Sequence, residues 1–159
     1  MINFPAFFSI ALQSYSFNPH NIQLYLSTQS IGGRLETWLN IGSDTALSDL
    51  TGSSAYQSTP PDEVMAVKSL LKTPIDRADN FGARLRTYIV PSISGRCTFY
   101  VASDDSSELW LSMDDTAANK VKIASVNGWT SPEQWTTYTS QKSAQVLLTA
   151  GNSYFLEAL

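Results

Sequence analysis

Residues 80–112 read NFGARLRTYIVPSISGRCTFYVASDDSSELWLS, and this stretch decides the fold class of the chain. Apolar and polar side chains alternate along residues 84–90, and Pro91 with a following Ser-Gly step interrupts the pattern. The chain returns through residues 96–103, and a further aromatic and aliphatic run follows at residues 108–113. Alternating runs of this length, broken by turn residues, are typical of short antiparallel strands. The stretch therefore predicts consecutive strands joined by short turns.

The same rhythm continues on both sides of this stretch. Residues 34–41 alternate imperfectly, and residues 121–126, 144–149 and 153–159 are further candidate strands. The abundance of Ser, Thr and aromatic residues and the low content of charged residues also favour strands over helices. We therefore predict an all-β fold, an antiparallel β-sandwich or barrel with long loops.

Two segments are defined less clearly by their sequence. Residues 52–61 are rich in turn residues and are expected to form a loop. Residues 63–71 follow a Pro-Pro-Asp step that would begin a helix well, and their apolar residues have helical spacing. The same residues also suit an extended strand, so helix and strand both stay open for this segment.

The chain is expected to divide at residue 30. Residues 1–30 carry no acidic or basic side chain, and we interpret them as a leader or linker segment, with an upstream strand as the alternative. Their apolar run, residues 4–12, is too short to span a membrane and lacks the basic start of a secretory signal. Residues 31–159 form the predicted domain. Because the chain stops at Leu159 inside an apolar run, we expect this copy to lack a last loop and strand.

The composition excludes several classes of partner. The 159 residues fit one domain that can bury a core, and a hydrophobic content of 43% argues against disorder. The net charge is −4, and no run of Lys or Arg occurs. Nothing would neutralise phosphates, so nucleic acids and anionic membranes are not expected as partners. No stretch is long enough to cross a bilayer as a helix, so we expect no membrane insertion by this domain.

Asp104 and Asp105 stand side by side between two apolar runs. One interpretation is a solvated hairpin loop, although adjacent carboxylates repel and most turns need one Asp. The other is a calcium site, because Ca²⁺ takes about 6–8 oxygen ligands and accepts carboxylates together with carbonyls and waters. A cis peptide bond or a sharp turn between the two residues would bring both carboxylates to one ion. Taken alone, the residues leave both interpretations open.

A second pair, Asp114 and Asp115, precedes the run at residues 121–126 in a longer loop. We expect these residues to shape a turn, because Asp side chains in turns accept hydrogen bonds from nearby backbone amides.

Three tryptophans are candidates for the core or for ligand binding. Trp110 stands between Leu109 and Leu111 and is expected in the core. Trp129 and Trp135 flank a loop and are the candidate ligand-binding residues, because exposed aromatic rings can stack on sugar rings. Burial in the core is the alternative for both.

No motif for catalysis is present. The chain has no Gly-x-Ser-x-Gly elbow, no His-Glu-x-x-His pair and no phosphate-binding glycine loop. Cys97 lies on the face of an alternating run that also carries Phe99 and Val101, which favours a buried apolar thiol. The single histidine, His20, lies in a different kind of segment. We therefore expect a protein that is not an enzyme.

Three segments taken in order closely resemble the protective-antigen-type domain, the "PA fourteen" family. They are NFGARLRTYIVPSISGRCTFYVASDDSSELWLS, KVKIASVNGWTSPEQW and QKSAQVLLTAGNSYFLEAL, and GGRLETWLNIGSDTALSDL resembles the opening strand of that family. The Ser-Asp-Asp-x-Ser-x-Leu-Trp-Leu motif with the later Ala-Gly-x-x-Tyr strand is the specific part. The resemblance covers residues 31–159 and implies a β-sandwich or barrel of antiparallel strands.

The resemblance also implies a function. Domains of this type occur in adhesins, carbohydrate-active enzymes, toxins and other secreted or cell-surface proteins. In the sugar-binding members an Asp-Asp pair with a cis peptide bond holds one calcium ion, and the ion binds sugar hydroxyls. Asp104 and Asp105 match that pair. The expected function is a non-catalytic, calcium-dependent carbohydrate-binding module of an extracellular or cell-surface protein with a role in adhesion, and its expected partners are glycans or glycoconjugates.

Two alternatives to this function stay open. One is a structural or protein-interaction module with no sugar site. The other is an accessory domain of a glycoside hydrolase whose catalytic part lies outside this chain. In the family, a loop that completes the calcium site follows the strand that matches residues 154–159, so we expect weak calcium binding in this copy.

Overall fold

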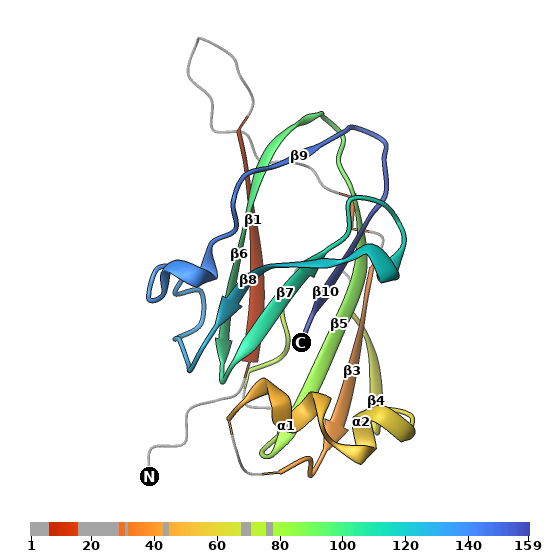
Figure 1. Ribbon diagram of the computed structural model, residues 1–159, viewed down its shortest axis with the longest axis vertical. Helices are drawn as coiled ribbons and strands as arrows, with labels where there is room; N and C mark the ends of the chain where they lie inside the picture. The colour runs from red at the N-terminus through yellow and green to blue at the C-terminus, as the bar shows by residue number, and fades with distance from the viewer. Residues whose placement is uncertain (1–6, 16–28, 31, 43–44, 68–70, 76–77) are drawn as a thin grey trace.

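The computed structural model describes residues 7–15, 29–30, 32–42, 45–67, 71–75 and 78–159. These residues form two antiparallel sheets (Figure 1). The smaller sheet has the strand order β1-β6-β9, and the larger has the order β4-β3-β5-β10-β7-β8, with β2 paired to β5. The prediction of an all-β antiparallel sandwich is confirmed.

The strands are β1 (Phe7–Tyr15), β2 (Gln29–Ser30), β3 (Gly33–Leu39), β4 (Glu63–Val67), β5 (Phe81–Val90), β6 (Gly95–Asp104), β7 (Ser107–Leu111), β8 (Val121–Val126), β9 (Val146–Leu148) and β10 (Tyr154–Ala158). The helices are short, namely α1 (Leu47–Thr51), α2 (Ser54–Ser58) and the 3₁₀ turns η1 (Ala117–Asn119) and η2 (Thr139–Gln141). The predicted strands at residues 84–90, 96–103, 121–126 and 153–159 therefore correspond to β5, β6, β8 and β10.

One apolar cluster holds residues from both sheets. The larger sheet supplies alternate residues of its strands, and the smaller sheet supplies alternate residues of β6 together with Leu148 of β9. Side chains of a strand point to opposite faces in turn, so each strand that covers this cluster alternates between core and surface. The most deeply buried members are Leu35, Leu85, Cys97, Phe99, Val101, Leu109, Leu111, Val126, Leu148, Leu156 and Ala158.

Strand β10 lies between β5 and β7 in the larger sheet (Figure 1). Tyr154 is opposite Ile89 of β5, and Leu156 is opposite Leu111 of β7. All five residues of β10 are buried. This strand therefore joins the β3–β5 part of the sheet to the β7–β8 part.

The two short helices lie between β3 and β4. Ser53 is the N-cap of α2, and its Oγ accepts a hydrogen bond of 3.1 Å from the backbone N–H of Tyr56. Helix α1 packs on β5, where a Cβ atom added to Gly82 would lie 2.5 Å from Cδ1 of Leu50. The loop predicted for residues 52–61 thus contains one helical turn, which its serine cap stabilises.

Strand β4 settles the segment that was open between helix and strand. Its residues pair with β3 from Gly33 opposite Val67 to Thr37 opposite Glu63. The extended form is therefore correct for residues 63–67, and residues 68–70 lie outside the described residues. Pairing with a neighbouring strand satisfies the backbone of this segment, and this outweighs its helical spacing.

Residues 7–15 form β1, which pairs with β6 from Phe7 opposite Asp104 to Tyr15 opposite Arg96. Of the interpretations given for residues 1–30, the upstream strand describes this part. Residues 1–6 and 16–28 lie outside the described residues, and the division of the chain at residue 30 stays a prediction.

The expectation that Trp110 lies in the core is wrong. Its neighbours Leu109 and Leu111 are 0% and 1% exposed and belong to the apolar cluster. A residue between two core residues of a strand points to the other face, so Trp110 lies on the outer face of the larger sheet. There Nζ of Lys120 lies 5.7 Å from the centroid of its ring.

The core predicts a large effect for Phe99→Ala. Phe99 is 0% exposed in β6, and truncating a fully buried Phe costs about 3–5 kcal/mol of unfolding free energy. The matched control is Leu147→Ala in β9, where the side chain is 59% exposed and the expected change is within about 0.5 kcal/mol. Urea unfolding of both variants checks this, and a similar cost for the two would contradict the described core.

Candidate functional site

The Asp104–Asp105 pair lies where β6 ends and the chain turns into β7. Figure 1 shows the turn that joins these two strands. Asp104 is the last residue of β6 and is half-buried, whereas Asp105 is exposed. The peptide bond between them is cis. The sequence-predicted metal ligands are therefore at one end of the sandwich, where the chain passes from β6 in the smaller sheet to β7 in the larger sheet.

The electrostatics of Asp104 show that the two carboxyl groups lie close together. Burial raises the pKa of Asp104 to about 6, and charge repulsion from Asp105 and a hydrogen bond with it act in the same direction. In the described part of the chain, no Lys or Arg forms an ion pair with either residue. A pair of carboxylates that is partly desolvated and has no cationic partner in the protein is suited to a bound cation.

The turn is anchored by two serines, Ser103 and Ser107. Their Oγ atoms lie 2.7 Å apart in a buried hydrogen bond. Ser103 also donates its backbone N–H to Oγ1 of Thr130 at 3.0 Å, and its carbonyl accepts the Thr130 N–H at 2.8 Å. Thr130 is 1% exposed. These bonds fix the loop after β8 beside the residue that precedes Asp104.

This attachment determines where the two candidate tryptophans lie. Trp129 precedes Thr130, so its backbone lies at the end of the sandwich that carries the Asp pair, and the residue is 44% exposed. Trp135 is half-buried and lies farther along the loop. The structure thus brings Trp129 to the end of the sandwich that carries Asp104 and Asp105, and it does not show the same for Trp135.

Gln141 holds the loop in shape. Its buried Nε2 donates to the carbonyls of Val101 at 2.9 Å and Gln134 at 2.7 Å, and its Oε1 accepts the backbone N–H of Tyr138. The hydroxyl of Tyr138 in turn donates to the carbonyl of Trp129 at 3.3 Å. The loop that carries Trp129 is therefore supported by buried hydrogen bonds to β6.

The residues that build this support have no predicted role from the sequence. Ser103 and Ser107 flank the aspartates within the family-like motif, and this is the signal that could have identified them. Thr130 and Gln141 carry no comparable signal, because their partners are 27 and 40 residues away in the chain.

Asp114 shapes a turn, as its sequence context predicts. Its carboxylate accepts hydrogen bonds from the Asn119 side chain at 2.7 Å, from Oγ of Ser112 at 2.8 Å and from the Thr116 N–H at 2.7 Å. These bonds, the one from Asn119 first, lower the pKa of Asp114. Its oxygens are thus already used within the loop, unlike those of the Asp104–Asp105 pair.

Cys97 and His20 are the other residues with reactive side chains. Cys97 is 1% exposed, and burial raises the pKa of its thiol, so the reactive thiolate form is disfavoured. His20 lies outside the described residues. Within those residues there is no group of three or more His, Cys, Asp or Glu side chains placed to share a metal ion. Likewise, none of the described helices is long and apolar enough to span a membrane.

The chain is similar to known proteins over part of its length. A family model described as "PA14 domain" matches residues 39–158. The chain is 39% identical over 84 residues to "N-acetyl-beta-glucosaminyl-glycoprotein 4-beta-N-acetylgalactosaminyltransferase 1" of Mus musculus. This aligned region covers 50% of this chain and 8% of that protein. The chain is 30% identical over 86 residues to "Fibrocystin-L" of Mus musculus, which covers 54% of this chain and 2% of that protein. The chain thus spans a small part of the length of either relative, and no solved structure matches it.

The raised pKa of Asp104 predicts a pH-dependent effect of Asp104→Asn in the calcium-free protein. Above about pH 6 the Asp104 carboxylate of the folded wild type is charged, although burial and the neighbouring Asp105 disfavour that charge. The neutral side chain in Asp104→Asn removes this destabilisation of the folded state. Asp104→Asn should therefore raise the melting temperature at neutral pH. The gain should shrink as the pH falls through 6 towards the ordinary Asp value of 3.8, where the wild-type carboxyl is protonated in both states.

Differential scanning calorimetry in EDTA at several pH values measures this gain. The control is Asp115→Asn, which removes an exposed carboxylate from a different loop, the one after β7, and should change the melting temperature little. A gain for Asp104→Asn that is constant with pH would show that the burial and repulsion described for this group are wrong.

Proposed function

The chain belongs to the PA14 domain family, and on this premise we propose that it is a non-catalytic, calcium-dependent carbohydrate-binding module of a secreted or cell-surface protein. The observation that carries the proposal is the Asp104–Asp105 pair. These two carboxylates lie together, are partly desolvated, and have no cationic partner among the described residues. They lie at the same end of the sandwich as the exposed Trp129.

Asp104 and Asp105 are the residues that would hold the calcium ion. When bound, the ion would offer open coordination positions to sugar hydroxyls, because Ca²⁺ accepts neutral oxygen ligands beside carboxylates. Two carboxylates do not complete the shell of an ion that takes about 6–8 oxygens. Waters, backbone carbonyls or further side chains would supply the others, and a site that rests on two carboxylates should bind calcium weakly.

The remaining residues of the site orient these groups. The Ser103–Ser107 hydrogen bond and the double contact between Ser103 and Thr130 fix the turn and the loop to each other. A sugar bound at the Asp pair would then contact the loop after β8, whose position these hydrogen bonds fix. The exposed Trp129 offers an apolar ring face on which a sugar ring can stack. Trp135 is the second, weaker candidate for such a contact.

One of the two relatives supports a role connected with glycans. It is named as an N-acetylgalactosaminyltransferase that acts on a glycoprotein, and the match covers 8% of it. A small matching part of a large glycan-modifying protein fits an accessory module. This observation favours a second candidate function, an accessory domain of a carbohydrate-active enzyme whose catalytic part lies outside this chain. A structural module with no sugar site is the remaining alternative.

The proposed location and partners follow from the same reasoning. Glycans and glycoconjugates on secreted or cell-surface proteins are the proposed partners, and adhesion is the proposed role. The net charge of −4 gives no basis for nucleic-acid binding.

Calcium is expected to stabilise the wild type, and Asp104→Ala is expected to abolish the effect. A ligand at a hundredfold excess over its dissociation constant stabilises the folded state by about 2.7 kcal/mol. The measurement is thermal unfolding with and without CaCl₂, with MgCl₂ as a matched cation. Asp115→Asn is the control variant and should keep the full calcium effect, because it lies outside the Asp104–Asp105 pair. Equal calcium stabilisation of the wild type and of an Asp104→Ala/Asp105→Ala double variant would refute the proposed ion site.

Trp129→Ala is expected to weaken glycan binding while leaving the calcium effect unchanged. If stacking on a sugar contributes as much as a pair of aromatic rings, about 0.5–1.5 kcal/mol, the loss should be roughly two- to thirteenfold. Glycan-array screening finds a ligand, and calorimetry then compares the wild type with Trp129→Ala and Trp135→Ala. A glycan that binds equally in EDTA and in calcium would support a sugar site elsewhere and contradict the role of the Asp pair.

A further inference from the structure

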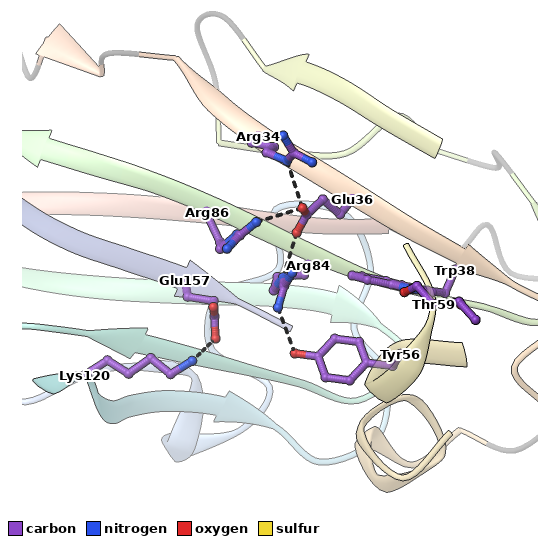
Figure 2. A network of polar contacts seen from close by, with 9 residues as sticks. All are labelled: Arg34, Glu36, Trp38, Tyr56, Thr59, Arg84, Arg86, Lys120 and Glu157. Carbon is purple, nitrogen blue, oxygen red and sulfur yellow. Dashed lines mark hydrogen bonds and ion pairs between the residues drawn. The ribbon is translucent and has the colours of Figure 1, made fainter. Parts of the chain in front are cut away.

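Four charged residues form a cluster on the outer face of the larger sheet, away from the Asp104–Asp105 turn. They are Arg34 and Glu36 of β3 and Arg84 and Arg86 of β5, and we call them the arginine cluster (Figure 2). Arg34 is directly opposite Arg86 in the strand register, and Glu36 is opposite Arg84. Pairing of β3 with β5 thus places three guanidinium groups around one carboxylate.

Glu36 is the centre of the arginine cluster and is 2% exposed. Its Oε1 accepts hydrogen bonds from Nε of Arg34 at 2.8 Å and from Nη2 of Arg86 at 2.7 Å. Its Oε2 accepts one from Nε of Arg84 at 2.7 Å. Burial opposes the charge of Glu36, but the hydrogen bonds and charges of the arginines prevail and lower its pKa. The carboxylate is therefore ionised and holds the arginines in place.

The arginine cluster carries an excess of positive charge. Three guanidinium groups meet one carboxylate, which leaves a local net charge of +2 on a chain whose net charge is −4. The neighbouring strands do not neutralise it. On the β4 side the opposing residues are Val64 and Ala66, and on the β10 side Glu157 already pairs with Lys120 (Figure 2).

The guanidinium of Arg84 is held by contacts within the protein, whereas Arg34 and Arg86 keep N–H groups that can donate to a ligand. The guanidinium of Arg84 lies 5.3 Å from the Trp38 ring and 5.4 Å from the Tyr56 ring, and its Nη1 donates to the Tyr56 hydroxyl. Among the described residues, Arg34 is bound through Nε only, and its side chain is 57% exposed. Within the same part of the chain Arg86 is bound through Nη2 only, and its side chain is 35% exposed. Both contact the same carboxylate oxygen, so their remaining N–H groups lie close together at the surface.

An exposed aromatic ring lies next to these donors. Tyr88 follows Arg86 by two residues on β5 and so shares its face of the sheet. Tyr88 is 41% exposed, and its ring is held edge-on against Phe155 of β10 at 5.7 Å between centroids. The outer face of the sheet therefore combines two arginines with free donors and a fixed aromatic ring.

We propose that this face binds an acidic sugar, with its carboxylate or sulfate group on Arg34 and Arg86 and its ring against Tyr88. Planar guanidinium groups match the oxygens of carboxylate and sulfate in paired hydrogen bonds. A bound oxyanion also offsets the repulsion between two guanidinium groups that share one oxygen of Glu36. The glycan part of this inference rests on the proposed function and extends it to acidic glycans, at a site separate from the Asp pair.

The experiment is an NMR titration of the 159-residue chain in EDTA, so that no calcium site contributes. The probes are sodium glucuronate, inorganic sulfate and glucose. Glucuronate should shift the backbone signals of β3 and β5 in a saturable manner at millimolar concentration, sulfate should bind more weakly at the same residues, and glucose should not bind there. Excess sulfate should displace glucuronate.

Two matched variants test the residues. Arg34→Gln removes a charge from an exposed side chain while Glu36 keeps Arg84 and Arg86, so the fold should persist and glucuronate affinity should fall about tenfold or more. Arg96→Gln removes the same charge from an exposed position of β6 in the other sheet and should leave the affinity nearly unchanged. Tyr88→Ala should weaken glucuronate binding but not sulfate binding.

Several outcomes would overturn the inference. They are the absence of saturable shifts with glucuronate, equal binding of glucose and glucuronate, and equal losses in the Arg34 and Arg96 variants. Sulfate binding that matches glucuronate and is indifferent to Tyr88→Ala would show a site for a free oxyanion and overturn the acidic sugar. The Asp104→Ala/Asp105→Ala variant separates the two proposals, because it should lose calcium stabilisation and keep glucuronate binding.

Discussion

The two-residue periodicity of the central strands β5 and β10 is the constraint on which the rest of the structure depends. Leu85 and Ile89 of β5 point into the core, and Arg84 and Arg86, on either side of Leu85, point to the outer face. In β10, Leu156 is in the core and Glu157 is on the outer face. A slip of one residue in either strand would exchange the two sets. The same register therefore fixes both the apolar core and the charged outer face of the larger sheet.

The end of the sandwich is organised by a different kind of contact. There the backbone of Ser103 is bonded to Thr130, and this attachment sets the Asp104–Asp105 turn beside the loop that carries Trp129. Rigid strands that present short loops are a common way to position binding residues. The Asp pair destabilises the folded state, because it brings two like charges together without a cationic partner in the described part of the chain. We interpret this destabilisation as the mark of function.

Much of the fold could be predicted because strand alternation and turn residues are local signals. The runs that became β5, β6, β8 and β10 and the family-like motif around Asp104 and Asp105 are of this kind. Contacts between distant residues gave no such signal. The arginine cluster needs the register of β3 on β5, and the β4 segment became a strand because β3 offered it an edge. Trp110 was assigned to the wrong face, since its apolar character outweighed its position between Leu109 and Leu111.

Binding of calcium by the Asp pair is the central claim, and a crystal structure determined from crystals grown in CaCl₂ tests it most directly. Anomalous diffraction data locate the ion independently of the refined coordinates. The account predicts one anomalous peak at the β6–β7 turn, with a carboxylate oxygen of both Asp104 and Asp105 at about 2.3–2.6 Å from the ion. A fully occupied calcium ion bound elsewhere, with only water between the two carboxylates, would contradict the account.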